Sequence, residues 1–381
     1  MDLGATVRRA STAGKIERLR RLMESRGLDA IVVSSYQNVS YFGGSTITTQ
    51  VTLPDRLGFL IARRDGAATL LFCNIEISQL RTQTDIDDIR EYVEFAQNPT
   101  HELVGVLRDL GLAAASIGVD ARRLPAASMS ILQQELPAVE VVPIDDELEL
   151  AQAVKDPEEI EALENAAQAS LGAIEESLRS LPRGATEREV SSAIYLRLMQ
   201  SGGKPLFMVF ASGERTLQAH PESTDTPMPA GTIWRIDYGA RFEGGIQSDL
   251  ARTGVVGKAS AEQQSTLRAL RAAQDAGFKA IEPGRPAKEV FFAVRDEFKR
   301  QGLPFVMPHV GHGMGIGLHE YPMLEPGNDT PLEVGMVLNV EPMALIPSRR
   351  EGYHTEDLAA VTEGGSRLLT PPQKELLVLP G

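Results

Sequence analysis

Hydrophobic positions in the first part of the chain alternate between helical spacing and short continuous runs. Residues 12–27 carry apolar side chains at helical spacing and end at Gly27, which predicts a helix, and residues 100–110 and 127–136 show helical patterns as well. Strand-like apolar runs lie between these helices, at Ala30–Val33, Leu57–Ala62, Thr69–Cys73, Ser116–Val119 and Val139–Val142. This alternation predicts a small α/β domain over residues 1–149.

A longer amphipathic pattern opens the second part of the chain. The run Asp156-Pro157-Glu158-Glu159 offers an N-cap, a proline in the first turn and acidic residues at the positive end of the helix dipole. Apolar residues then recur at steps of three and four from Ile160 to Leu181, which predicts a helix with one buried face. We therefore place the domain boundary at the acidic stretch Asp145–Glu149 and assign residues 150–381 to a second domain.

An internal repeat with an offset of 100 residues runs through this second domain. Residues 184–190 align with residues 284–290, and Gly202 aligns with Gly302. Each copy predicts a helix, a Gly/Pro turn, a second helix, a glycine stop and then strands. Two similar helix links could arise by chance, but the shared order of elements favours two duplicated halves related by a pseudo-two-fold axis.

Acidic residues lie at matching places in the two copies. The first copy predicts a hairpin that turns at Glu243 and places Asp237 directly across from Asp249, with Cβ atoms roughly 4.5–5.5 Å apart on one face. In the second copy, Glu341 ends a predicted strand and Glu356 lies on the returning strand. If the halves face each other, four carboxylates converge, and they repel unless protons or cations lie between them.

The segment between the two hairpins, residues 308–320, contains several glycines and histidines. Glycines allow close backbone approach while histidines such as His312 project. Four carboxylates and a histidine, without cysteine, suit manganese, iron, cobalt or zinc. Carboxylates that bridge two ions would hold a shared water of increased acidity, ready to attack a carbonyl.

Each of these residues also has a plainer interpretation. Asp237 and Asp249 could be solvated hairpin ends, His312 a loop histidine and Glu341 a strand end. The glycine run at 311–317 lacks both Gly-x-Gly-x-x-Gly and a Walker lysine, which argues against nucleotide binding there. The matching pairs in the two copies favour the functional interpretation.

Composition and charge exclude several classes of protein. Hydrophobic residues make up 42% and charged residues 24%, which is typical of a globular protein. A net charge of −14 argues against nucleic-acid or anionic-membrane binding. No apolar run approaches the ~18 residues of a membrane span, and Met1–Arg21, with Arg8 and Arg9, lacks the apolar core of a secretory signal. A single cysteine, Cys73, excludes an internal disulfide and fits a reducing, cytoplasmic location.

With these acidic and histidine segments, the sequence resembles the creatinase/prolidase/methionine aminopeptidase superfamily, the pita-bread metallopeptidases. The resemblance covers nearly the whole chain, and residues 29–44 are similar to the creatinase/prolidase N-terminal domain, which methionine aminopeptidases lack. It implies an α/β (α+β) protein in which that domain, residues 1–149, precedes a pseudo-two-fold pita-bread catalytic domain, residues 150–381. It also implies two divalent metal ions per chain. Manganese is the first expectation, and cobalt, zinc and iron are the alternatives. Segments similar to the family's ligand segments supply Asp237, Asp249, His312, Glu341 and Glu356.

The same resemblance implies roles beyond metal binding. His220 and His319 match positions that bind the substrate carbonyl and stabilise the tetrahedral intermediate as hydrogen-bond donors. Glu341 is the candidate proton shuttle as well as a ligand. His309 has no assigned role, and loop packing explains it equally well. Family members commonly form homodimers, so a homodimer is expected.

The resemblance implies hydrolysis of a C–N bond, as in Xaa-Pro dipeptidase or aminopeptidase P, with a small peptide or amide as substrate. Two departures weaken the proline assignment: His354 replaces an arginine usual in proline-specific relatives, and Met343 replaces a glycine. One alternative is a hydrolase of a small amidine or cyclic amide, like creatinase or ectoine hydrolase. The other is a catalytically silent pita-bread binding protein, although such proteins usually lose ligands. We expect His354→Arg to raise, or at least not lower, Xaa-Pro dipeptide hydrolysis.

Overall fold

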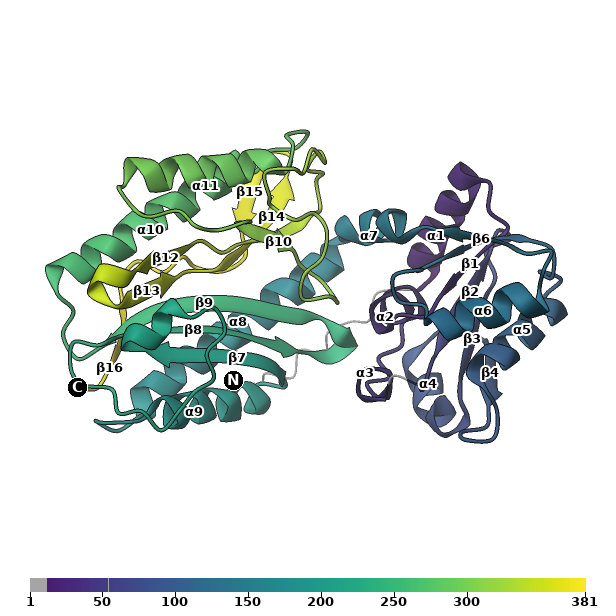
Figure 1. The fold of residues 1–381 in the computed structure, drawn as a ribbon, viewed down its shortest axis with the longest axis horizontal. Helices are drawn as coiled ribbons and strands as arrows, with labels where there is room; N and C mark the ends of the chain where they lie inside the picture. Colours follow the sequence, from purple (N-terminus) through teal and green to yellow (C-terminus); the bar gives the residue numbers. More distant parts are fainter. Residues whose placement is uncertain (1–11, 54) are drawn as a thin grey trace. The chain divides into compact units, whose positions relative to one another are not determined.

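The computed structural model describes residues 12–53 and 55–381, so Arg8 and Arg9 lie outside the described residues. The chain forms two compact units that divide after Gln152 (Figure 1). Among the described helices, none combines the length and apolar character needed to cross a membrane.

The first unit is built on a six-stranded sheet with the strand order β4-β3-β2-β1-β5-β6. The β1–β2 and β2–β3 pairs are antiparallel, whereas β3–β4, β1–β5 and β5–β6 are parallel. The strands are β1 (Ala30–Val33), β2 (Phe59–Arg63), β3 (Ala68–Cys73), β4 (Asp88–Tyr92), β5 (Ser116–Val119) and β6 (Glu140–Pro143). The helices are α1 (Thr12–Arg26), α2 (Tyr36–Gly43), α3 (Thr49–Thr52), α4 (Ile77–Gln83), α5 (Pro99–Asp109), α6 (Ala126–Glu135) and α7 (Asp145–Ala153).

Hydrophobic side chains of the sheet and its helices form the core of this unit. Leu103 and Leu107 of α5 and Leu132 of α6 pack in one cluster with Ile61 and Leu71 of the sheet. The predicted strands are present within a residue or two, but polar β4 gave no apolar run and was missed. The acidic stretch at 145–149 lies within helix α7.

The second unit starts with a helix pair and a sheet. Helix α8 begins at Pro157 with a capping box formed by Asp156 and Glu159, as its sequence predicts. Helices α8 and α9 contact strands β9 and β7, and the sheet has the order β16-β9-β8-β7. These elements are α8 (Pro157–Ser180), α9 (Glu187–Gln200), β7 (Lys204–Ser212), β8 (Ile233–Arg241), β9 (Gln247–Val256) and β16 (Leu377–Leu379).

The second copy repeats this order of elements. Gly184 and Gly284 adopt positive φ in the links between paired helices, and Gly202 and Gly302 do so after the second helices. One sheet has the order β10-β11-β14-β15, and β12 pairs with β13. The elements are α10 (Ala261–Ala280), α11 (Lys288–Arg300), β10 (Gly311–Gly313), β11 (Val337–Val340), β12 (Met343–Ile346), β13 (Glu351–His354), β14 (Asp357–Thr362) and β15 (Gly365–Leu368).

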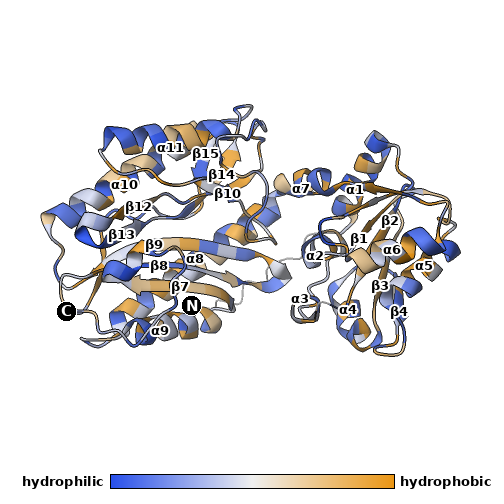
Figure 2. Cartoon of the chain, in the orientation of Figure 1, coloured by the Kyte–Doolittle hydropathy of each residue, from blue (hydrophilic) through white to orange (hydrophobic). Residues whose placement is uncertain are grey.

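The sheets of the two copies meet inside this unit, with the paired helices on the outside (Figure 1). Strand β13 contacts β8 and β9, and β14 contacts β9. In Figure 2 strand β7 is largely hydrophobic, whereas α10 and α11 carry both hydrophilic and hydrophobic residues. On these two helices Leu270 and Val290 are fully buried, and they pack with Leu338 of β11 in one core. The strands that carry Asp237 and Asp249 therefore lie between two helix-covered layers.

Candidate metal centre

Strands β8 and β9 bring the first acidic pair onto one face of the sheet. Asp237 pairs with Ala251, and Asp249 pairs with Gly239. The expected direct opposition of Asp237 and Asp249 is therefore wrong, because the hairpin turns one residue later, at Gly244 with φ 73°. A later turn centre shifts the pairing by two residues, and a shift of two leaves each side chain on its original face. The two carboxylates are diagonal neighbours.

The second pair lies where two β ladders are interrupted. Val340 pairs with Asp357, and Met343 pairs with His354, so Glu341 faces Glu356 across the break. Pro342 follows Glu341 and has no N–H to donate, which explains why the ladder stops here. The strand expected to end at Glu341 ends at Val340, with β12 after the break, and the return strand expected through Glu356 is divided into β13 and β14.

His312 projects from β10 into the space between these pairs and is fully buried. Its Nε2 atom lies 3.6 Å from Glu341 Oε1 and 3.9 Å from both Asp249 Oδ2 and Glu356 Oε1. Its Nδ1 atom lies 2.9 Å from the Gly313 carbonyl oxygen. An N–H at Nδ1 would donate to that carbonyl, leaving the Nε2 lone pair directed at the carboxylates.

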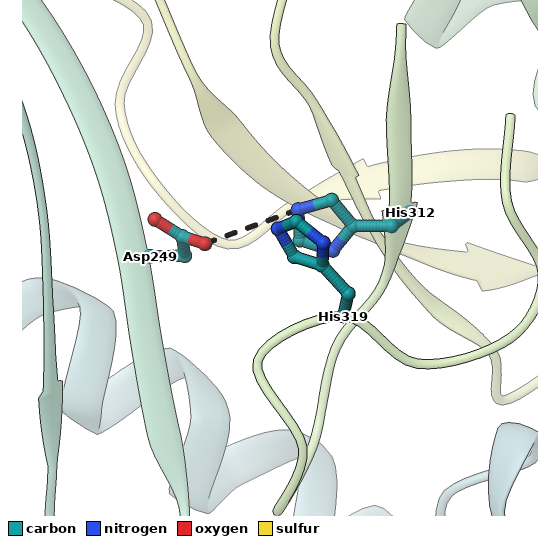
Figure 3. Close-up of side chains that lie close together, drawn as sticks. All are labelled: Asp249, His312 and His319. Carbon is teal, nitrogen blue, oxygen red and sulfur yellow. Dashed lines mark ion pairs between the residues drawn. The ribbon is translucent and has the colours of Figure 1, made fainter. Parts of the chain in front are cut away.

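His319 lies beside His312, with ring centroids 4.2 Å apart and Asp249 opposite (Figure 3). Potential ligand atoms lie within 4.8 Å of one another in three groups. They are Asp237/Asp249/Glu356, His312/Glu341/Glu356 and Asp249/His312/His319. The structure therefore brings the five predicted ligands together, and His319 with them.

Several atoms at this centre are buried without a hydrogen-bond partner within the described part of the chain. They are Asp249 Oδ1, His312 Nε2, Glu341 Oε1 and both carboxylate oxygens of Glu356. A buried acceptor without a partner costs roughly 1–3 kcal/mol, and more when it is charged. Divalent cations would satisfy these oxygen and nitrogen atoms, so the residues fit the implied ions.

Burial also shifts the acid–base properties of the centre. It raises the pKa of Asp237 to about 6 and, together with the charge on Asp237, raises the pKa of Glu341 to about 8. Burial followed by neighbouring carboxylates holds the pKa values of Asp249 and Glu356 well above their ordinary values. Burial and then His319 lower the pKa of His312 to about 3. Bound cations would reverse the carboxylate shifts.

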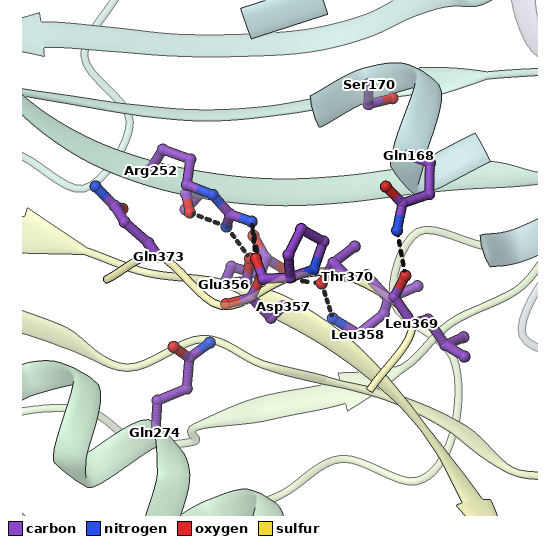
Figure 4. Close-up of polar contacts among 12 residues, drawn as sticks. Gln168, Ser170, Arg252, Gln274, Glu356, Asp357, Leu358, Leu369, Thr370 and Gln373 are labelled. Atoms are coloured by element: carbon purple, nitrogen blue, oxygen red, sulfur yellow. Dashed lines mark hydrogen bonds and ion pairs between the residues drawn. The ribbon is translucent and has the colours of Figure 1, made fainter. Parts of the chain in front are cut away.

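A buried polar network behind the centre fixes the position of Glu356 (Figure 4). Arg252 donates to the backbone oxygens of Ala251 and Glu356 at 2.8 and 2.7 Å and forms an ion pair with Asp357 at 2.7 Å. Asp357 also accepts from Thr370 at 2.9 Å. The family resemblance gave Arg252 no role, and its link to Glu356 depends on the meeting of the two copies.

His220 lies on an exposed loop whose backbone is hydrogen-bonded by the buried side chain of Arg235. Arg235 is fully buried and donates to the backbone oxygens of Thr216 at 3.0 Å, Ala219 at 2.7 Å and Gln218. His220 belongs to none of the candidate ligand groups. The pKa of His319 is lowered by burial first and then by the neighbouring histidines His309 and His220.

His354 and His309 both lie beside Glu341. His354 Nε2 is 3.8 Å from Glu341 Oε2, His354 Nδ1 is 3.9 Å from Asp237 Oδ2, and the side chain is 1% exposed. His309 Nδ1 is 3.4 Å from Glu341 Oε1, with a third of its side chain exposed. Burial and then the charge on Arg235 lower the pKa of His354 to about 3. A guanidinium at this position would meet the same two penalties, so we revise the expectation: His354→Arg should lower activity.

Comparisons with known proteins agree with this architecture. The profile of the Creatinase/Prolidase N-terminal domain matches residues 15–154, and that of metallopeptidase family M24 matches residues 161–363. The Xaa-Pro dipeptidase of Pyrococcus furiosus is 28% identical over 366 residues, covering 95% of this chain and 99% of the relative.

Solved structures extend the similarity to the fold. The Xaa-Pro dipeptidase from Bacillus anthracis has a TM-score of 0.85 at 27% identity, covering 97% of this chain and all of that one. Dipeptidase PepE from Mycobacterium ulcerans has a TM-score of 0.84 at 30% identity, covering 98% of this chain and 99% of that one. The chain therefore belongs to metallopeptidase family M24 and is a metal-dependent hydrolase with the two-domain pita-bread architecture.

Proposed function

We propose that this protein is a dinuclear metallopeptidase that hydrolyses Xaa-Pro dipeptides. One observation carries the proposal: five side chains from both copies of the repeat converge, and four of them carry buried oxygen or nitrogen atoms without a hydrogen-bond partner. Manganese is the first candidate among manganese, cobalt, zinc and iron. The proposed ligands are Asp237, Asp249, His312, Glu341 and Glu356.

The chemistry follows from the arrangement of these residues. Two divalent ions held there would polarise the scissile carbonyl and increase the acidity of the attacking water. Glu341 would take a proton from that water and deliver it to the leaving nitrogen. His319 is exposed at the edge of the centre, where an N–H can donate to the carbonyl oxygen as negative charge develops. His220, on its anchored loop, is the second proposed donor.

The substrate assignment rests on relatives that match almost the whole chain. Two that align over nearly their full length are named Xaa-Pro dipeptidases. The competing candidate is a small non-peptide amide or cyclic amidine, and Met343 and His354 favour it because both depart from the proline-specific pattern. A silent binding protein is the weakest candidate, because no proposed ligand is missing. A homodimer is also part of the proposal, to be checked by light scattering.

A hydrolysis screen tests the proposal directly. The chelator-treated protein, resupplied with Mn²⁺, Co²⁺, Zn²⁺ or Fe²⁺, should bind about two ions per chain and cleave Xaa-Pro dipeptides in preference to longer Xaa-Pro peptides. Asp249→Asn should weaken ion binding and abolish turnover, whereas Asp296→Asn, on the exposed side of α11, should not. A folded protein that takes up no transition metal would contradict the proposal. Cleavage of cyclic amidines but of no Xaa-Pro peptide would support the small-amide candidate instead.

A further inference from the structure

His354 occupies a fixed position at the end of β13, inside the proposed centre. Its backbone N–H donates to Thr253 Oγ1 at 2.8 Å, and the Thr253 hydroxyl donates back to the His354 carbonyl at 2.8 Å. This pair of bonds ties β13 to β9, the strand that carries Asp249. The imidazole therefore projects from backbone that is held on both sides.

The imidazole itself is buried and has no conventional partner. Neither Nδ1 nor Nε2 forms a hydrogen bond within the part of the chain that the structure describes. Each nitrogen faces a different carboxylate, Nδ1 toward Asp237 and Nε2 toward Glu341, at 3.9 and 3.8 Å. Two unpaired nitrogens in a side chain that is only 1% exposed indicate a missing binding partner, because a purely packing role would favour an apolar residue.

His354 belongs to none of the three candidate ligand groups, so the ion that it would bind is inferred from the carboxylate that its Nδ1 atom faces. Two groups contain His312, whereas the group of Asp237, Asp249 and Glu356 contains carboxylates alone. His354 Nδ1 faces Asp237 of that group. Its other nitrogen faces Glu341, which matches the usual arrangement in which a ligating imidazole donates its second N–H to a carboxylate.

We propose that His354 supplies Nδ1 as a ligand to the ion held by Asp237, Asp249 and Glu356, while its Nε2–H donates to Glu341. The inference rests on the proposed dinuclear centre and adds a sixth protein ligand to it. An imidazole changes an all-oxygen site into a mixed nitrogen–oxygen site, which shifts preference from Mn²⁺ toward Co²⁺ and Zn²⁺. His354 thereby becomes a determinant of metal selectivity.

Spectroscopy of the wild-type protein loaded with Co²⁺ tests the ligand without any substitution. If His312 and His354 both bind Co²⁺, two exchangeable imidazole N–H resonances should be paramagnetically shifted. One shifted resonance in protein that holds two Co²⁺ ions would overturn the His354 assignment and leave the dinuclear centre intact. Protein that binds no Co²⁺ would instead overturn the proposed function, and the inference with it.

Substitution then tests selectivity. His354→Leu and His354→Gln should weaken one of the two ion-binding steps by at least about 10-fold, with a larger loss for Co²⁺ than for Mn²⁺ in calorimetric titrations. The control is His309→Leu, which removes another imidazole beside Glu341 and should leave the Co²⁺/Mn²⁺ preference unchanged. Equal losses in the His309 and His354 variants, or unchanged affinities in folded His354→Gln, would contradict a ligand role.

Discussion

The residues of the centre depend on backbone contacts from the opposite copy of the repeat. The Glu356 N–H donates to the Ala251 carbonyl at 3.1 Å, and Arg252 donates to the Glu356 carbonyl at 2.7 Å. Glu356 is thus held by the β9 residues two and three positions after Asp249. Thr253, four positions after Asp249, holds the backbone of His354. These hydrogen bonds involve the backbone of Glu356 and do not depend on the charge of its side chain. They therefore hold the carboxylate in place although burial raises its pKa.

Arg235 offers a residue-scale test of how the His220 loop is held. Arg235→Lys should lower kcat/KM by about 10-fold or more, because a lysine cannot reproduce the fork that binds three carbonyl groups and small misplacements are costly in catalysis. In a His220→Ala background the same substitution should have little further effect. Steady-state kinetics of the four proteins measure this coupling.

Metal content controls for damage to the centre in these Arg235 variants. Ion stoichiometry should match that of the wild type, because Arg235 bonds to the loop rather than to a proposed ligand. Losses that simply add in the double variant would show that Arg235 does not act through His220.

At the scale of elements, the loop between β10 and β11 is fixed by a buried ion pair. Lys155 donates to Glu320 Oε2 at 2.7 Å with side chains 3% and 11% exposed, and Glu320 Oε1 accepts from the Gly317 N–H at 2.7 Å. A Cβ on Gly315 would lie 2.4 Å from the Glu320 carboxylate, so a larger residue would displace it. His319 directly precedes Glu320, so this pair also positions a proposed catalytic donor.

Lys155→Met should lower the free energy of unfolding by about 3–5 kcal/mol, because it leaves the Glu320 carboxylate buried without its counter-ion. Urea denaturation of the ion-free protein measures the loss. The matched control is Lys288→Met, which breaks the more exposed pair with Asp329 and should change stability little. Equal effects of the two substitutions would refute the special role of the buried pair.

At the scale of the whole molecule, the crowded carboxylates should make the ion-free protein less stable as the pH rises from about 7.5 to 8.5. Glu341 has a folded-state pKa of about 8, raised from 4.5, so the proton is lost first in the unfolded state. The stabilisation linked to that proton is complete below the unfolded pKa and is lost as the pH rises through about 8, with a slope on the order of 1 kcal/mol per pH unit per proton.

His312 and His354 contribute little in this window. Their pKa values are lowered from 6.5 to about 3 in the folded protein, so both are neutral there, and in the unfolded chain roughly nine-tenths of each is neutral one pH unit above 6.5. Melting temperatures with chelator and with excess Mn²⁺ measure the effect, because bound cations hold the carboxylates ionised and should remove the slope. Glu341→Gln should flatten the slope without metal, and an unchanged slope in this variant would disprove the assignment to Glu341.

Much of the fold was predictable because its signals are local. Helix α8 begins at Pro157 because its capping box and apolar spacing lie within one stretch of sequence. Side chains alternate between the two faces of a strand, so an error of two residues in the predicted register left Asp237 and Asp249 on the same face. The sequence alone therefore determined which residue types face the centre, and the repeat indicated that two halves would meet.

Only the tertiary structure decided the details that depend on non-local pairing. The register of β8 and β9, the ladder break at Glu341 and the bond from Arg252 to Glu356 are set by strands that pack from distant parts of the chain. The burial of His354 between Asp237 and Glu341 belongs to the same class, because no local pattern distinguishes a histidine at a substrate-facing edge from one inside a centre. Residue types and periodicity are local properties, whereas the distances that create a metal site arise from packing.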